Sequence, residues 1–146
     1  FVQVDPGTVH AITGGVMVLE TQQSSDITYR VYDYDRLFNG KKRSLHLKEC
    51  KGVITVPSDN VKVMHFDDVY GVQRMIDCSK YCVDKITVKE DVDISVTDSF
   101  RLFSCVEGEG FANGIKVKKG DHFMAPANTD SVMLKGDMIL ISSTAK

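Results

Sequence analysis

The chain has 146 residues, and its 18 Lys and Arg residues against 20 Asp and Glu residues give a formal net charge of −2. A chain of this length forms one ordinary domain or two very small β modules, and it can bury a hydrophobic core without metal or disulfide cross-links. The near-neutral charge, with no basic block longer than residues 41–43, argues against nucleic-acid binding. No apolar run approaches the roughly 18 residues of a membrane-spanning helix, so we expect no membrane partner.

The first residues, Phe1-Val2-Gln3-Val4, have the composition of the middle of a strand. They include neither an initiator methionine nor the charged leader and apolar segment of a signal peptide. Because a folded chain seldom begins inside a sheet, we expect an N-terminal portion of the protein to precede this sequence.

Four cysteines are scattered along the chain, at Cys50, Cys78, Cys82 and Cys105. They are too few for a disulfide scaffold, and the spacing from Cys78 to Cys82 is one residue too long for a redox CxxC pair. A second ligand pair at zinc-ribbon spacing is absent from the sequence. The cysteines therefore predict reduced structural thiols and a cytoplasmic protein.

Short apolar stretches separated by turn residues predict strands along the whole chain, at residues 1–4, 16–20, 28–34, 100–106, 115–118, 131–134 and 138–142. Gly14-Gly15 and Asn113-Gly114 are typical of tight hairpins because these residues accept a positive φ, and residues 119–121 and 135–137 predict two further turns. Ser44 is expected to cap one short helix at residues 45–50. The long amphipathic helices of a parallel α/β fold are missing, so the sequence predicts an all-β sandwich or barrel.

His10 follows a Pro6-Gly7 turn at the start of a predicted strand. In a small barrel such a turn bends the chain and points the next inward side chain into the barrel mouth. A neutral imidazole at that position can ligate a divalent metal. By itself the pattern also fits a hydrogen-bonded structural histidine.

A polar stretch at residues 19–35 contains Glu20, Asp26 and Arg30 between strong strand formers. Arg30 has a permanent charge and a fork of donors that suit a phosphate or an anionic intermediate. The same three residues also fit a solvated ion-pair network on a barrel rim. The residues alone leave both interpretations open.

Several of these segments together resemble the type I mannose-6-phosphate isomerases of Gram-positive bacteria. The resemblance lies in residues 6–12 (Pro-Gly-Thr-Val-His-Ala-Ile), residues 19–36, the Leu45-His46-Leu47 segment, and residues 102–110, 118–123 and 125–127. It implies a cupin-like (jelly-roll) fold and the C-terminal half of a protein about twice as long. It further implies a zinc-dependent aldose–ketose isomerase that interconverts mannose 6-phosphate and fructose 6-phosphate.

The resemblance also implies roles for individual residues. The histidine of the Pro-Gly turn, His10, corresponds to a zinc ligand, and Arg30 corresponds to the family's catalytic arginine. Glu20 and Asp26 correspond to acidic residues that bind the substrate or orient the residues that do. The remaining zinc ligands would precede Phe1, in the N-terminal half of the protein. This sequence departs from its relatives at Asp5, where they carry proline or another small neutral residue.

The polar composition of the middle of the chain and the resemblance together lead us to expect three segments. Residues 1–56 would complete a metal-binding cupin barrel and include the short helix, residues 57–67 would form a connector, and residues 68–146 would form a second, metal-free cupin barrel. The expected partners are a phosphorylated hexose and the N-terminal half of the same protein, without which the chain is expected to be inactive. The alternative is a non-catalytic cupin module that binds a sugar or an acidic metabolite.

Overall fold

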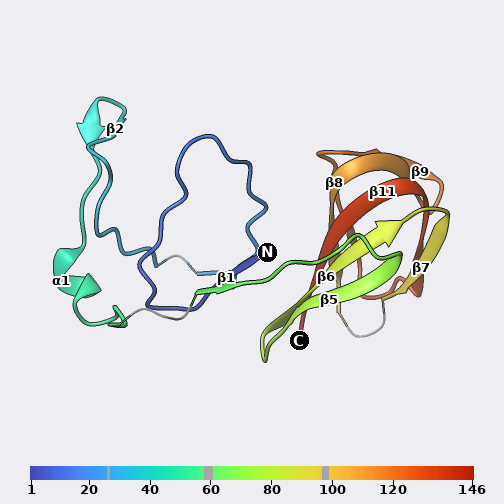
Figure 1. Ribbon diagram of the computed structural model, residues 1–146, viewed down its shortest axis with the longest axis horizontal. Helices are drawn as coiled ribbons and strands as arrows, with labels where there is room; N and C mark the ends of the chain where they lie inside the picture. Colours follow the sequence, from blue (N-terminus) through green and yellow to red (C-terminus); the bar gives the residue numbers. More distant parts are fainter. Residues whose placement is uncertain (26, 58–60, 97–98) are drawn as a thin grey trace. The chain divides into compact units, whose positions relative to one another are not determined.

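The computed structural model describes residues 1–25, 27–57, 61–96 and 99–146. The chain divides into two compact units, Phe1–Met64 (unit 1) and His65–Lys146 (unit 2) (Figure 1). The boundary between them lies within residues 57–67, the segment predicted as a connector.

Unit 1 consists largely of irregular backbone held by short elements (Figure 1). Strand β1 (Val2–Val4) pairs antiparallel with β4 (Val61–Val63). Strand β2 (Leu37–Phe38) pairs antiparallel with β3 (Lys41–Lys42). The helix α1 (Leu47–Cys50) follows, and its last residue, Cys50, is buried.

The strands predicted at residues 16–20 and 28–34 do not form in the described backbone. The Gly14-Gly15 turn is present, and Gly15 has a φ of 88°. However, a strand needs a neighbouring strand to accept and donate its backbone hydrogen bonds, and none of the described strands pairs with these residues. Their apolar side chains are exposed as a result, and Met17 is 90% exposed. The short apolar stretches were therefore insufficient to predict these strands.

The helix also differs from the prediction, because α1 begins at Leu47 and Ser44 does not cap it. His46 stands at the N-cap position, and its carbonyl oxygen accepts the backbone N–H of Cys50 at 2.9 Å. The carbonyl oxygen of Ser44 instead accepts a hydrogen bond from Arg30.

Unit 2 contains one seven-stranded antiparallel sheet that curls around a hydrophobic core (Figure 1). The main strand order is β10-β8-β11-β6-β5, with β7 paired to β11 and β9 paired to β8. The strands are β5 (Gly71–Asp77), β6 (Tyr81–Val88), β7 (Asp91–Ser95), β8 (Arg101–Ala112), β9 (Ile115–Lys118), β10 (His122–Ala125) and β11 (Ser131–Ala145). With α1 the single helix among the described residues, the expected all-β class is confirmed.

The core of unit 2 is formed by side chains from one face of each long strand. Ile86 on β6, Phe103 on β8, and Leu134 and Leu140 on β11 are at most 1% exposed. The ring of Phe103 stacks on Phe123 of β10, with 4.8 Å between ring centroids. Each buried side chain of this size stabilises the folded state by about 1.5–3 kcal/mol, so this core holds the curled sheet together.

The predicted turns are correct at Asn113-Gly114, between β8 and β9, and at residues 119–120, between β9 and β10. The turn predicted at residues 135–137 is wrong, because β11 continues through it. Residues before Gly136 pair with β7, and those after Asp137 pair with β6. Gly136 has a φ of 120° and packs on Gly110 of β8 so closely that a Cβ atom would lie 2.7 Å from the Gly110 Cα. The glycine thus marks a change of partner strand instead of a chain reversal.

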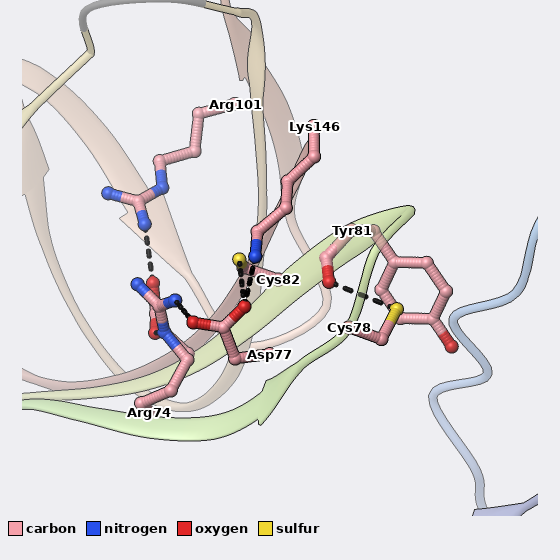
Figure 2. Close-up of polar contacts among 8 residues, drawn as sticks. Arg74, Asp77, Cys78, Tyr81, Cys82, Arg101 and Lys146 are labelled. Carbon is pink, nitrogen blue, oxygen red and sulfur yellow. Dashed lines mark hydrogen bonds and ion pairs between the residues drawn. The ribbon is translucent and has the colours of Figure 1, made fainter.

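An ionic cluster around Asp84 of β6 holds one end of the unit 2 sheet. Figure 2 shows four of its members, Arg74, Asp77, Arg101 and Lys146. Asp84 is 1% exposed, and its two carboxylate oxygens accept hydrogen bonds from Arg74 of β5 and Arg101 of β8. Arg74 also pairs with Asp77, which in turn binds Lys146. The cluster therefore ties β5, β6 and β8 to the end of the chain.

Candidate active site

The turn before His10 is fixed by a close backbone contact. Gly7 has a φ of 86°, and a Cβ atom there would lie 2.7 Å from both the Thr55 Oγ1 and the Val53 carbonyl oxygen. The Thr55 N–H donates to the Gly7 carbonyl oxygen at 3.0 Å, and the Thr8 N–H donates to Asp5 at 3.2 Å. Both the left-handed backbone and the lack of space require glycine at this position.

His10 is exposed, and its Nδ1 lies 2.9 Å from the carbonyl oxygen of Thr8. A carbonyl oxygen only accepts hydrogen bonds, so Nδ1 carries the proton in this contact. In the neutral ring Nε2 then keeps its lone pair. A histidine that donates from one ring nitrogen to a backbone carbonyl and presents the other to solvent has the arrangement of a metal ligand.

Arg30 is partly buried and is held at both its backbone and its guanidinium group. Its N–H donates to Nδ1 of His46 at 2.9 Å, and its carbonyl oxygen accepts the N–H of His46, also at 2.9 Å. Its Nη1 donates to the carbonyl oxygen of Ser44 at 3.3 Å. Residues 44–46 thus fix the origin of the Arg30 side chain and contact its charged end.

A buried carboxylate reinforces this contact from the same two segments. Asp33 is 6% exposed, and it accepts hydrogen bonds from Arg43, including one from Nε at 2.8 Å, and from Arg36 at 2.9 Å. Chiefly because of the hydrogen bonds with Arg43, and despite an opposing effect of burial, the pKa of Asp33 falls from its ordinary 3.8 to about 2. The ion pair therefore persists well into acid and holds residues 30–33 beside residues 43–46.

Residues 44–55, which we call the anchor segment, contact the surroundings of both His10 and Arg30. The part before α1 binds Arg30 through Ser44 and His46. The part after α1 binds the Gly7 turn through Thr55. Backbone hydrogen bonds from Val53 and Ile54 to the Cys50 carbonyl oxygen join this part to the helix. One continuous, hydrogen-bonded segment therefore positions the two residues singled out in the sequence.

The acidic candidates are not joined to this arrangement. Glu20 is exposed, and among the described residues it makes no hydrogen bond or ion pair with His10 or Arg30. Asp26 lies outside the described residues. The structure therefore connects His10 and Arg30 through the anchor segment and leaves the roles of Glu20 and Asp26 as predictions.

No group of three or more His, Cys, Asp or Glu residues within the described ranges has the geometry to hold a metal ion. Within the described residues, His10 therefore belongs to no such group. All four cysteines are free thiols, with Cys50, Cys82 and Cys105 buried and Cys78 partly exposed. Burial raises the pKa of the Cys105 thiol, which favours its protonated form.

Unit 2 contains a separate pocket of about 480 Å³ next to β9 and β10. Its lining includes Lys116, Asp121, His122 and Met124, and none of the candidate residues from unit 1. His122 is engaged there, since its Nδ1 lies 2.8 Å from Ser104 Oγ. In the described chain, no helix has the length and apolar character needed to cross a bilayer.

His46 is the residue near Arg30 that sequence reasoning undervalued. It has no neighbour at ligand spacing, and on spacing alone it suggests a surface histidine. Its contact with Arg30 joins two irregular segments that are 16 positions apart. Neither the 2-residue period of a strand nor the 3.6-residue period of a helix predicts such a contact. The single signal was that both residues belong to segments carrying the resemblance.

Comparisons with known proteins connect this geometry to one family. The sequence profile of "Mannose-6-phosphate isomerase, cupin domain" matches residues 72–145. The chain is 40% identical to mannose-6-phosphate isomerase ManA of Bacillus subtilis over 144 residues, which cover 93% of this chain and 46% of that protein. It is 35% identical to mannose-6-phosphate isomerase of Streptococcus mutans over 150 residues, covering 98% of this chain and 48% of that protein.

A solved structure supports the same family relationship. The crystal structure of mannose 6-phosphate isomerase from Bacillus subtilis matches with a TM-score of 0.61 and 32% sequence identity, over 82% of this chain and 40% of that one. The chain spans about half the length of the curated relatives it matches. The matched profile, the two relatives and the shared fold show that the chain belongs to the mannose-6-phosphate isomerase family and has its cupin fold.

Proposed function

We propose that this chain is part of a zinc-dependent isomerase that interconverts mannose 6-phosphate and fructose 6-phosphate. The proposal is supported by relatives that carry this activity in their names and that align with nearly the whole chain. Because those relatives are about twice as long, we further propose that polypeptide outside this sequence supplies the rest of the active site. The free thiols support a cytoplasmic enzyme.

The observation that carries the proposal is the anchoring of His10 and Arg30 by one segment. His10 is exposed, its Nδ1 is bound to Thr8, and the turn before it is bound to Thr55. Arg30 is tied to His46 and Ser44 at the other end of the same segment. A metal ligand and a cation held by one segment fit the binding of a sugar phosphate whose oxygens develop negative charge during reaction.

The reaction transfers a proton between C1 and C2 of the sugar through an enediolate, with no net oxidation. Arg30 would stabilise the negative charge that develops on the enediolate oxygen through its planar, cationic guanidinium. Anchoring by Ser44 and His46 reduces the reorganisation that this stabilisation requires. The contribution of Arg30 is therefore electrostatic, and it is made chiefly in the transition state.

Glu20 and Asp26 complete the proposed set. A carboxylate at Glu20 is able to move a proton between the two carbons or to orient Arg30, and Asp26 lies in the same polar stretch. We assign both residues to substrate binding or to orientation of the groups that contact the substrate. Arg30 remains the proposed catalytic residue.

His10 fits zinc, because its Nδ1–H is bound to Thr8 and its Nε2 is the free nitrogen. When bound, zinc polarises the sugar oxygens and lowers the energy of developing negative charge. A single imidazole does not hold zinc tightly, since catalytic sites use three protein ligands. We therefore propose that this chain alone neither retains zinc nor isomerises the sugar phosphate.

The test is a coupled isomerase assay on the complete protein that contains this sequence, with mannose 6-phosphate as substrate. We expect turnover that is lost after chelation and returns on addition of zinc, and no turnover with residues 1–146 alone. Turnover that persists after exhaustive chelation would contradict the zinc-dependent mechanism. Binding of mannose 6-phosphate without turnover by the complete, zinc-loaded protein would instead support the non-catalytic module.

A further inference from the structure

His46 and Arg30 form a reciprocal pair of hydrogen bonds between two irregular segments. The Arg30 N–H donates to the His46 ring at 2.9 Å, and the His46 N–H donates to the Arg30 carbonyl oxygen at 2.9 Å. The two bonds lie on opposite sides of the Arg30 Cα. They therefore hold the backbone from which the guanidinium projects.

The first of these bonds specifies the chemistry required at position 46. A backbone N–H only donates, so Nδ1 of His46 must carry a lone pair, and the neutral ring then has its proton on Nε2. The Tyr29 ring lies beside the imidazole, with centroids 6.1 Å apart and planes tilted by 48°. Position 46 thus needs a side chain that presents an acceptor at the place of Nδ1.

His46 is itself firmly held. Its carbonyl oxygen accepts the N–H of Cys50, which is 3% exposed, so the residue is attached to the buried end of α1. Of the two residues just before Leu45, Arg43 binds Asp33, and Ser44 contacts the Arg30 guanidinium. The imidazole therefore attaches Arg30, which lies in irregular backbone, to the start of the fixed helix α1.

We propose that His46 is a positioning residue for Arg30: its neutral imidazole holds the Arg30 backbone so that the guanidinium meets the enediolate. This inference rests on the proposed catalytic role of Arg30. Loss of the acceptor would let Arg30 move without removing its charge. Since the guanidinium acts in the transition state, kcat should fall while KM changes little.

The decisive variants are His46→Leu, which removes the acceptor, and His46→Asn, whose Oδ1 can take the place of Nδ1. In the complete protein loaded with zinc, we expect His46→Leu to lower kcat by about 10- to 100-fold with KM nearly unchanged. His46→Asn should recover most of the lost kcat. His65→Leu is the matched control, an exposed histidine in unit 2 that receives the same substitution, and it should leave both constants unchanged.

A double-mutant cycle distinguishes a positioning role of His46 from a general loss of structure. If His46 acts through Arg30, His46→Leu should have almost no further effect in an Arg30→Lys background. Equal losses in both backgrounds would overturn the inference. If Arg30→Lys alone is fully active, the proposed catalytic role of Arg30 is wrong. If Arg30→Lys is inactive but His46→Leu is fully active, the positioning role of His46 is wrong and the role of Arg30 stands.

A readout independent of activity is hydrogen exchange at the Arg30 amide, followed by NMR in the complete protein. We expect a slow exchange in the wild type and in His46→Asn, and a faster exchange in His46→Leu at unchanged global stability. An Arg30 amide that exchanges equally fast in all three proteins would contradict the contact on which the inference is built.

Discussion

At the residue scale, the account depends first on the guanidinium of Arg30. Arg30→Lys keeps one positive charge but loses the planar fork of donors. We expect kcat to fall by about 100- to 1,000-fold, the usual loss when one donor to a developing oxyanion is removed. Steady-state kinetics of the complete enzyme would measure this. Arg36→Lys, which keeps a cation near Asp33, should retain wild-type kcat, and a loss as large as that at position 30 would contradict the assignment.

Asp33 makes a pH-dependent contribution to the stability of unit 1. Its pKa is lowered from 3.8 to about 2, so the folded state favours the charged carboxylate more than the unfolded state does. The stabilisation is complete above about pH 4 and is lost as the pH falls through about 2. Denaturant unfolding at several pH values, followed by tyrosine fluorescence, would measure it. Over this pH range the free energy of unfolding should fall less in Asp33→Asn than in the wild type. The same fall in both proteins would refute the assignment.

Three residues show which parts of the candidate site could be predicted from the sequence. His10 and Arg30 stood out because a Pro-Gly turn and a polar stretch between strand formers are local patterns. His46 did not, because its partner is distant in the chain and neither residue lies in a regular element. Local patterns singled out His10 and Arg30 as candidates, but they did not single out His46, whose ring accepts the Arg30 N–H.

At the element scale, most of the predicted turns and most of the predicted strands form, and the failures have separate causes. Asn113-Gly114 was predicted correctly because both residues have a positive φ, which is a property of the residues themselves. Residues 16–20 and 28–34 were predicted wrongly because a strand depends on a partner that the pattern does not name. Gly136 was mistaken for a turn because a glycine that permits close packing and one that reverses the chain have the same sequence signal.

The close approach of the paired strands β8 and β11 gives a test with a matched control. Gly108 and Gly120 both have a positive φ, which asparagine tolerates. A Cβ atom would lie 2.1 Å from the Asp137 carbonyl oxygen at Gly108, and would meet nothing within 4 Å at Gly120. Gly108→Asn should therefore destabilise unit 2 by about 1–3 kcal/mol more than Gly120→Asn. Equal unfolding midpoints for the two variants would show that the contact does not matter.

The Asp84 cluster links three strands and predicts a larger loss. Asp84→Asn would leave Arg101, whose side chain is 12% exposed, without its counter-charge. We expect a destabilisation of about 3 kcal/mol, measured by chemical denaturation. Asp91→Asn removes an ion pair with Lys135 whose side chains are both more than half exposed, and it should cost less than about 1 kcal/mol. Comparable losses at both sites would contradict the role of the buried cluster.

At the scale of the whole molecule, the family relationship and the geometry support each other from different parts of the chain. The cupin profile matches within unit 2, whereas His10, Glu20 and Arg30 lie in unit 1. The aligned relatives extend over both units. The all-β class followed from composition and turn spacing, but the site could not, because one histidine after a Pro-Gly turn also fits a hydrogen-bonded structural residue.

The proposed mechanism requires His10 and Arg30 to serve one sugar-phosphate site. It is tested most directly by a crystal structure of the complete protein with zinc and a hexitol 6-phosphate, which lacks the reactive carbonyl. We predict Nε2 of His10 bound to the metal and the Arg30 guanidinium in contact with the sugar at C1 or C2. Zinc held without His10, or a sugar bound away from Arg30, would contradict the account.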